Sequence, residues 1–250
     1  MARAEGIAFR SIGGTAVGLD EVAACLSADG IVVFTRAHRT RLADLLEPWT
    51  VARTHPHADG GAVTVIEPHP SASEPGSNGF SRGAVAPHTD RALIRQPPAL
   101  AAVLVERPAT SGGLSLLVDL KADRWFRLLA RHRPTQRSLW LHAADGSRWP
   151  VIEATGGLMR ARFRDDDLAR PRHTGVPGRV LLARLRTLSA KPLVLRLGEG
   201  EGYMVHNHRV LHGRSAFPGY RRVVRLLADV RPEHPFTWLN DGFVLEGRRG

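Results

Sequence analysis

The stretch Ala99-Leu100-Ala101-Ala102-Val103-Leu104-Val105 is a continuous apolar run that lies between Pro97-Pro98 and Pro108. A buried strand reads as such a run, whereas a half-buried strand alternates apolar and polar residues. Prolines at both ends limit the run to strand length, because proline cannot continue a ladder of hydrogen bonds. Residues 99–105 are therefore predicted to form a buried strand.

Further strand candidates lie on both sides of this run. They are residues 31–34, 62–66, 114–118, 138–142, 158–163, 193–197, 203–205 and 223–230. Helices are predicted before Gly30, at 41–47 and at 122–131. Many short strands with long connections are typical of a jelly roll. The sequence thus predicts a mainly β fold with flanking helices, in one domain that spans residues 1–250.

The composition fits an intracellular globular protein. The chain has 250 residues, a hydrophobic fraction of 43%, 25 glycines and 17 prolines. Cys25 is the single cysteine, so an internal disulfide is impossible and a reducing compartment is expected. Residues 1–15 hold no apolar run of signal-peptide length, and no stretch approaches the ~20 apolar residues of a membrane span. We expect a cytoplasmic protein without a membrane anchor.

The net charge of +11 raises the question of nucleic-acid binding. Only two of the 35 basic residues are lysines, and the arginines are scattered along the chain. The sequence has no zinc finger, no aromatic RNA-binding signature and no lysine-rich tail. An anionic substrate or an acidic protein partner explains the charge better than nucleic acid does.

The triplet His88-Thr89-Asp90 offers two metal ligands. At i and i+2 of an extended segment both side chains point to the same face and can reach one ion. Twelve histidines and 24 acidic residues predict roughly one such triplet by chance, and His57-Ala58-Asp59 is a second one. Since His57 and Asp59 run into the turn signal Gly60-Gly61, His88 and Asp90 are the preferred pair.

His212 is the candidate for a third ligand. Two imidazoles and one carboxylate hold one face of a non-heme Fe(II) site and leave the other face open. His206 and His208 lie close by at the end of a predicted strand, and a lone histidine in that place is more often structural. The residues around His212 decide between them.

The string Asn207-His208-Arg209-Val210-Leu211-His212-Gly213-Arg214-Ser215-Ala216-Phe217 resembles the distal-histidine segment of a known family. This is the taurine dioxygenase, clavaminate synthase and γ-butyrobetaine hydroxylase family of Fe(II)/2-oxoglutarate-dependent oxygenases. His88-Thr89-Asp90, Gly112-Gly113-Leu114-Ser115 and the 221–226 segment follow the family's order. The resemblance implies a cupin-like double-stranded β-helix, with His88, Asp90 and His212 as iron ligands and O2 and 2-oxoglutarate as co-substrates.

The resemblance also implies a binding site for the far carboxylate of 2-oxoglutarate. Guanidinium suits a carboxylate better than ammonium does, because it binds in a bidentate manner. Arg225 matches the family's arginine best, and Ser115 takes the position of a hydroxyl that binds the same carboxylate. By strand alternation Arg221 shares the face of Arg225, whereas Arg222 points away. Arg221 is the alternative anchor for the far carboxylate, or it contacts the near carboxylate or an anionic substrate. Asn207 and Arg214 are expected to orient the loop around His212.

The carboxylate of Asp90 separates this chain from halogenating relatives, which carry alanine or glycine there. The resemblance therefore implies hydroxylation, or a related desaturation or ring closure, of a small polar metabolite such as an amino acid or an intermediate of specialised metabolism. The loop at 67–79 should border that substrate. The rival hypotheses are a non-catalytic jelly-roll binding protein and a nucleic-acid-directed oxygenase or binder. The sequence is compatible with a homo-oligomer.

Overall fold

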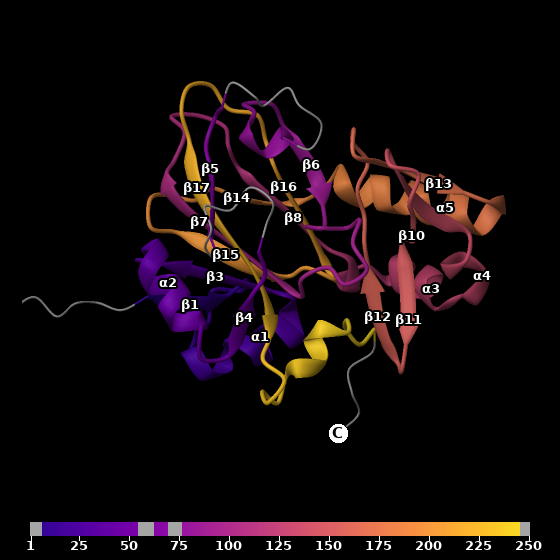
Figure 1. Cartoon of the computed structure of the whole chain (residues 1–250), viewed down its shortest axis with the longest axis horizontal. Coiled ribbons are helices and arrows are strands. Elements are labelled where there is room, and N and C mark those ends of the chain that lie inside the picture. Colours follow the sequence, from indigo (N-terminus) through magenta and orange to yellow (C-terminus); the bar gives the residue numbers. More distant parts are fainter. Residues whose placement is uncertain (1–6, 55–62, 70–76, 246–250) are drawn as a thin grey trace, which may run out of the picture.

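Two antiparallel sheets form the centre of the protein in the computed structural model, which describes residues 7–54, 63–69 and 77–245 (Figure 1). The larger sheet has the order β2 (Ala16–Val17), β1 (Ala8–Ser11), β3 (Ile31–Thr35), β15 (Gly202–His206), β7 (Leu100–Arg107), β17 (Arg222–Val230) and β4 (Thr50–Ala52), and β5 (Val63–Ile66) also pairs with β17. The smaller sheet has the order β14 (Leu193–Leu195), β8 (Ser115–Asp119), β16 (Val210–Arg214) and β6 (Val85–His88).

The apolar run at 99–105 is confirmed as a buried strand. It forms β7, which lies between β15 and β17 in the larger sheet. Successive side chains of a strand point to opposite faces, and both faces of β7 are covered. Leu100, Ala102 and Leu104 belong to one buried cluster, and Ala101, Val103 and Val105 belong to another.

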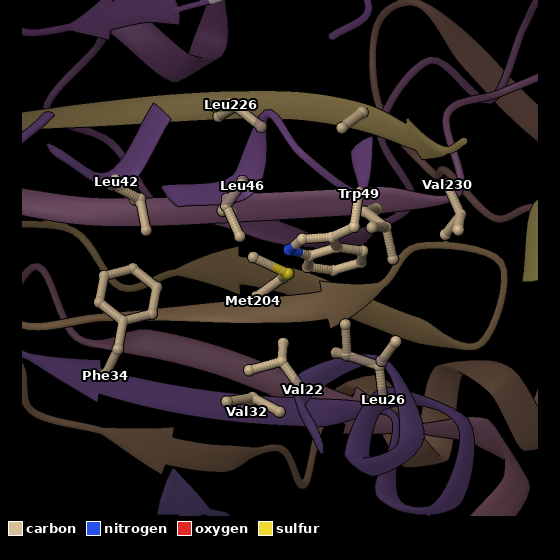
Figure 2. Packing of buried hydrophobic residues seen from close by; sticks show 14 of the residues in the cluster. Val22, Leu26, Val32, Phe34, Leu42, Leu46, Trp49, Met204, Leu226 and Val230 are labelled. Carbon is tan, nitrogen blue, oxygen red and sulfur yellow. The ribbon is translucent and has the colours of Figure 1, made fainter. Parts of the chain in front are cut away.

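The outer face of the larger sheet is covered by two helices, α1 (Val22–Asp29) and α2 (Arg39–Leu46). Figure 2 shows Val22 and Leu26 of α1 on one side of Met204, with Leu42, Leu46 and Trp49 on the other. Helix α1 ends at Gly30, whose φ of 74° lies in the left-handed region that glycine adopts without strain. These helices stabilise the sheet from outside, so the space between the two sheets remains for a site.

The inner face of the larger sheet packs on the smaller sheet. Their shared core holds Val103, Tyr203 and Val223 from the larger sheet with Leu117 and Val210 from the smaller. Two face-to-face sheets with alternating inward side chains make a sandwich of the jelly-roll type. The predicted mainly β, cupin-like fold with flanking helices is thus confirmed.

Between β8 and β14 the chain builds a third layer, on the right of Figure 1. It holds α3 (Arg124–Arg131), α4 (Arg133–Gln136), β9 (Leu139–Ala143), β10 (Arg148–Pro150), β11 (Ile152–Thr155), β12 (Leu158–Ala161), β13 (Ala169–His173) and α5 (Gly175–Ser189). Its apolar core includes Phe126, Leu141 and Leu185. The Cβ of any residue other than glycine at position 178 would lie 2.1 Å from the carbonyl oxygen of Ser138, so this glycine lets α5 approach β9.

Several element boundaries differ from the sequence predictions. The predicted strand at 193–197 is shorter, and the helix predicted at 122–131 begins only at Arg124, where Asp123 accepts a hydrogen bond from the Phe126 amide. Helices α4 and α5 and strands β1, β2, β4, β6, β10, β11, β13 and β16 were not predicted. No helix among residues 7–54, 63–69 and 77–245 is long and apolar enough to cross a membrane.

Candidate metal centre

The pairing of β6 with β16 brings the two ligand histidines together. In this antiparallel pair His88 stands opposite His212, although they lie far apart in the sequence. The register shifts between His212 and Arg214, and a Cβ at Gly213 would come within 2.4 Å of the carbonyl oxygen of Val85. Gly213 therefore allows the close backbone approach that sets the two imidazoles side by side.

His88, Asp90 and His212 form the one group of metal-ligating side chains found in the described part of the chain. Their ligand atoms all lie within 4.8 Å of one another. The Nε2 of His212 is 3.1 Å from Oδ2 of Asp90, and the Nε2 of His88 is 3.9 Å from Oδ1. The two imidazole ring centres are 5.2 Å apart. This geometry brings together the three residues that the sequence predicted.

The protonation states of His88 and Asp90 suit a metal. Burial, helped by Arg164 and His212, lowers the pKa of His88 to about 3, so its imidazole is neutral. Burial would raise the pKa of Asp90, but Arg225 and His212 together bring that pKa well below its usual range. The Nδ1 of His88 donates to the carbonyl of Ala86 at 2.9 Å, which leaves the Nε2 lone pair for a ligand role. Neutral imidazoles with an ionised carboxylate are the donor set that a divalent metal requires.

Asn207 fixes the backbone that carries Asp90. Its amide oxygen accepts from the Asp90 N–H at 2.8 Å, and its amide nitrogen donates to the carbonyls of Asp90 and Pro98 at 3.0 and 2.8 Å. The sequence predicted that Asn207 orients the loop around His212, whereas its side-chain hydrogen bonds are made to the backbone of Asp90 and Pro98. Thr89, which the sequence analysis did not use, adds a hydrogen bond from the Phe163 amide to its hydroxyl.

Arg214 holds the segment in front of β6. Its guanidinium donates to the carbonyls of Asn78, Gly79, Ser81 and Gly83. Asn78 in turn donates to the carboxylate of Asp167 at 2.9 Å. Asn78 and Gly79 line the cavity at the metal centre, which agrees with the expectation that the 67–79 loop borders the substrate. Residues 70–76 of that loop, and the second triplet His57-Ala58-Asp59, lie outside the described residues.

The three predicted 2-oxoglutarate contacts all face the same cavity. Arg225 donates to Oδ1 of Asp90 at 2.8 Å, so it lies directly behind a metal ligand. Arg221 is buried above the ring of Phe217 and has no hydrogen-bond or ion-pair partner in the described part of the chain. Ser115 is buried at the start of β8, close to Tyr203. Arg222 points away, as predicted, and pairs with Glu106 at 2.9 Å.

The cavity at the metal centre has a volume of about 350 Å³ and is strongly basic. Asp90 is the one acidic residue in its described lining, which also includes five arginines: Arg91, Arg164, Arg214, Arg221 and Arg225. Apolar walls come from Leu93, Ile94 and Leu168. A cavity of this size admits small molecules, and its charge favours anions.

The chain is similar to a family of dioxygenases and to solved structures of oxygenases. The family model described as taurine catabolism dioxygenase TauD, TfdA family matches residues 2–227. Among solved structures, an asparagine oxygenase in complex with Fe(II), 2S,3S-3-hydroxyasparagine and succinate has a TM-score of 0.60 and 18% identity, over 84% of this chain and 78% of that chain. PvcB from Pseudomonas aeruginosa has a TM-score of 0.60 and 15% identity, over 93% of this chain and 98% of that chain.

The non-heme iron oxygenase OrfP, in complex with Fe and alpha-ketoglutaric acid, has a TM-score of 0.58 and 16% identity, over 76% of this chain and 62% of that chain. At such identities the likeness to these structures shows the fold. No curated protein sequence matches this chain at a significant level.

Proposed function

Because this chain belongs to the taurine catabolism dioxygenase TauD, TfdA family, we propose that His88, Asp90 and His212 bind the Fe(II) of its active site. The protein is a 2-oxoglutarate-dependent non-heme iron dioxygenase. When bound, Fe(II) and 2-oxoglutarate supply the chemistry of the family, in which 2-oxoglutarate and O2 yield succinate and CO2 as a C–H bond of the substrate is oxidised. We take residues 1–250 as one oxygenase domain. Because the chain has a single cysteine and no possible internal disulfide, we propose that the protein works in the reducing cytoplasm.

The observation that carries the metal assignment is the register of β6 and β16. It sets His88 opposite His212, and the turn after β6 returns Asp90 to the same point. Arg225 occupies Oδ1 of Asp90 and leaves Oδ2 directed at His212. Asn207 holds the Asp90 backbone, so the carboxylate is oriented before any metal arrives. Such positioning by neighbours is what keeps metal ligands in the required geometry.

Arg221 with Ser115 is the arrangement that the geometry favours for the far carboxylate of 2-oxoglutarate. The near carboxylate and the 2-oxo group would lie at the metal, so the far carboxylate must lie at a distance from Asp90. Arg225 contacts Asp90 itself, whereas Arg221 is a buried guanidinium that has no anionic partner in the described part of the chain. A charge buried in this way is costly until an anion binds it. The sequence favoured Arg225 as the main anchor, and the affinities of the Arg221→Gln and Arg225→Gln variants for 2-oxoglutarate distinguish the two arginines.

A small polar metabolite with an anionic group is the proposed substrate. The cavity is small and basic, and Arg225 faces it beside the metal ligands. The asparagine oxygenase structure holds 3-hydroxyasparagine, and one OrfP structure holds a dihydroxy-arginine. We therefore propose hydroxylation of an amino acid or of a similar metabolite, with the carboxylate of the substrate facing Arg225.

Replacement of a ligand histidine tests the metal assignment. His88→Ala and His212→Ala should each lose the iron and, with it, the visible absorption band that Fe(II) and 2-oxoglutarate give when mixed without oxygen. Succinate formation should fall to background. The matched control is His57→Ala, which removes the histidine of the other triplet and should keep both the band and the iron content. The reverse result, loss in His57→Ala alone, would move the metal site to the second triplet.

A further inference from the structure

The turn that follows the metal ligand Asp90 carries an arginine on a strained backbone. Arg91 has a φ of 55°, and among the described residues only Arg36 shares a positive φ without being glycine. A left-handed conformation costs free energy for a residue with a Cβ, and it persists only where its surroundings impose it. Such strain is concentrated at functional sites.

Arg162 holds the residues that follow Arg91 from behind. Its buried guanidinium donates to the carbonyl of Ala92 at 3.3 Å and to that of Ile94 at 2.9 Å. Glu153 accepts from the same guanidinium at 2.6 Å and holds it in place. The turn is therefore fixed, and Arg91, Ala92 and Ile94 line the cavity together.

The charge of Arg91 is not compensated. It has no hydrogen-bond or ion-pair partner among residues 7–54, 63–69 and 77–245. The carboxylate of Asp90 attracts it, whereas Arg225 and Arg53 repel it. Asp90 already accepts from Arg225, and Arg53 lies 3.2 Å from a carboxylate oxygen of Asp229. Arg91 and Arg225 thus present two positive charges to the cavity with one carboxylate between them.

Bound Fe(II) and 2-oxoglutarate would not remove this excess, because their charges are equal and opposite. Arg221 would be neutralised by the far carboxylate, and Asp90 would share its charge with the metal. Arg225 would then share the carboxylate of Asp90 with the metal, and Arg91 would face the substrate without an anion of its own. A buried or half-buried guanidinium is best satisfied by a carboxylate, through charge-assisted hydrogen bonds.

We propose that Arg91 is a specificity-determining residue that binds a second acidic group of the substrate. This inference rests on the proposed function, in which Arg225 faces the first acidic group. The substrate is then an acidic amino acid or a comparable dicarboxylate, and its neutral amide and basic analogues are disfavoured. Charge selection of this kind uses repulsion as well as attraction, since Arg91 opposes a cationic side chain in the same cavity.

Matched acid and amide pairs test this inference by binding. L-Aspartate with L-asparagine, and L-glutamate with L-glutamine, are titrated without oxygen into the enzyme loaded with Fe(II) and 2-oxoglutarate. The change in the visible band and the heat of binding report the dissociation constant. For at least one pair the wild type should bind the acid about tenfold or more tightly than the amide, as the loss of a charged hydrogen bond predicts.

Arg91→Gln should abolish that preference and leave the affinity for the amide unchanged, whereas Arg91→Lys should keep part of it. Arg95→Gln is the matched control, because Arg95 is exposed in the same turn and does not line the cavity. Equal binding of acid and amide to the wild type would overturn the inference, and so would an equal loss of both in Arg91→Gln. Failure of the wild type to form the Fe(II)/2-oxoglutarate band would instead contradict the proposed function.

Discussion

Arg209 and Arg221 are both buried arginines, and both lie immediately before a strand that builds the site. Arg209 donates to both carboxylate oxygens of Asp119, at 2.7 and 2.6 Å, and to the carbonyls of Ser27 and Ala28. Arg221 has the ring of Phe217 as its neighbour and no hydrogen bond within the described residues. The protein itself satisfies the first guanidinium, whereas the second awaits a ligand.

The other arginines near the site divide in the same way. Arg162 and Arg214 donate mainly to backbone carbonyls, and they hold the turn after Asp90 and the segment before β6. Arg91 lies in the cavity and lacks such partners in the described part of the chain. The number of guanidinium N–H groups that have a partner within the protein therefore separates arginines that stabilise the fold from arginines that are available to bind small molecules.

The largest effect is expected where a satisfied arginine is removed. Arg209→Gln leaves Asp119 and two carbonyls without their partner, so the free energy of unfolding should fall by about 3–5 kcal/mol. Urea denaturation measures this change. Arg170→Gln is the control, because Arg170 is exposed and pairs with Asp165 at 3.5 Å, and surface pairs contribute about 0–1 kcal/mol. A similar loss in both variants would contradict the distinction between the two kinds of arginine.

Removal of the unsatisfied arginine should have the opposite signature. Arg221→Gln should weaken 2-oxoglutarate binding about tenfold to hundredfold, the loss expected for hydrogen bonds to a charged group. The stability without 2-oxoglutarate should stay the same or rise, because an unpaired buried charge is gone. Titration of 2-oxoglutarate into the Fe(II) enzyme and urea denaturation measure the two effects.

Two neighbours of Arg221 serve as comparisons in the same titration. Arg222→Gln is the control, since Arg222 points out of the cavity toward Glu106. Arg225→Gln tests the alternative anchor, because Arg225 lies beside Asp90. If Arg225→Gln binds 2-oxoglutarate more weakly than Arg221→Gln does, Arg225 is the main anchor of the far carboxylate, as the sequence predicted.

A smaller effect is expected from buried histidines that are satisfied only when neutral. Burial lowers the pKa of His206 to about 4, below the value of about 6.5 expected in the unfolded chain. The unfolded state therefore binds more protons below pH 6.5, and the contribution of His206 to stability is lost as the pH falls toward 4. At pH 5.5 this loss amounts to about 1.4 kcal/mol.

Urea denaturation at pH 7.5 and pH 5.5 checks this value. In His206→Gln the loss of stability between the two pH values should be smaller by that amount, because glutamine does not titrate. His173→Gln is the control, since His173 is exposed. An unchanged pH dependence in His206→Gln would show that this histidine is not held neutral.

Prediction from the sequence was most successful where a local pattern is compatible with only one kind of structure. The apolar run at 99–105 could only be satisfied by burial on both faces, and β7 is the result. Helix α5 was missed because Gly175, Pro177 and Gly178 open it and read as a turn. Its position depends on the contact between Gly178 and Ser138, which no local pattern contains.

By itself the sequence determined which residue types could bind iron and where the most apolar strands lie, because both follow from side-chain chemistry and local periodicity. Only the tertiary structure decided how the arginines are used. Arg214 and Arg221 have the same side chain, yet backbone carbonyls surround the first and the second faces the cavity without an anion. The partner of a guanidinium comes from distant parts of the chain, so its role is fixed only when those parts pack together.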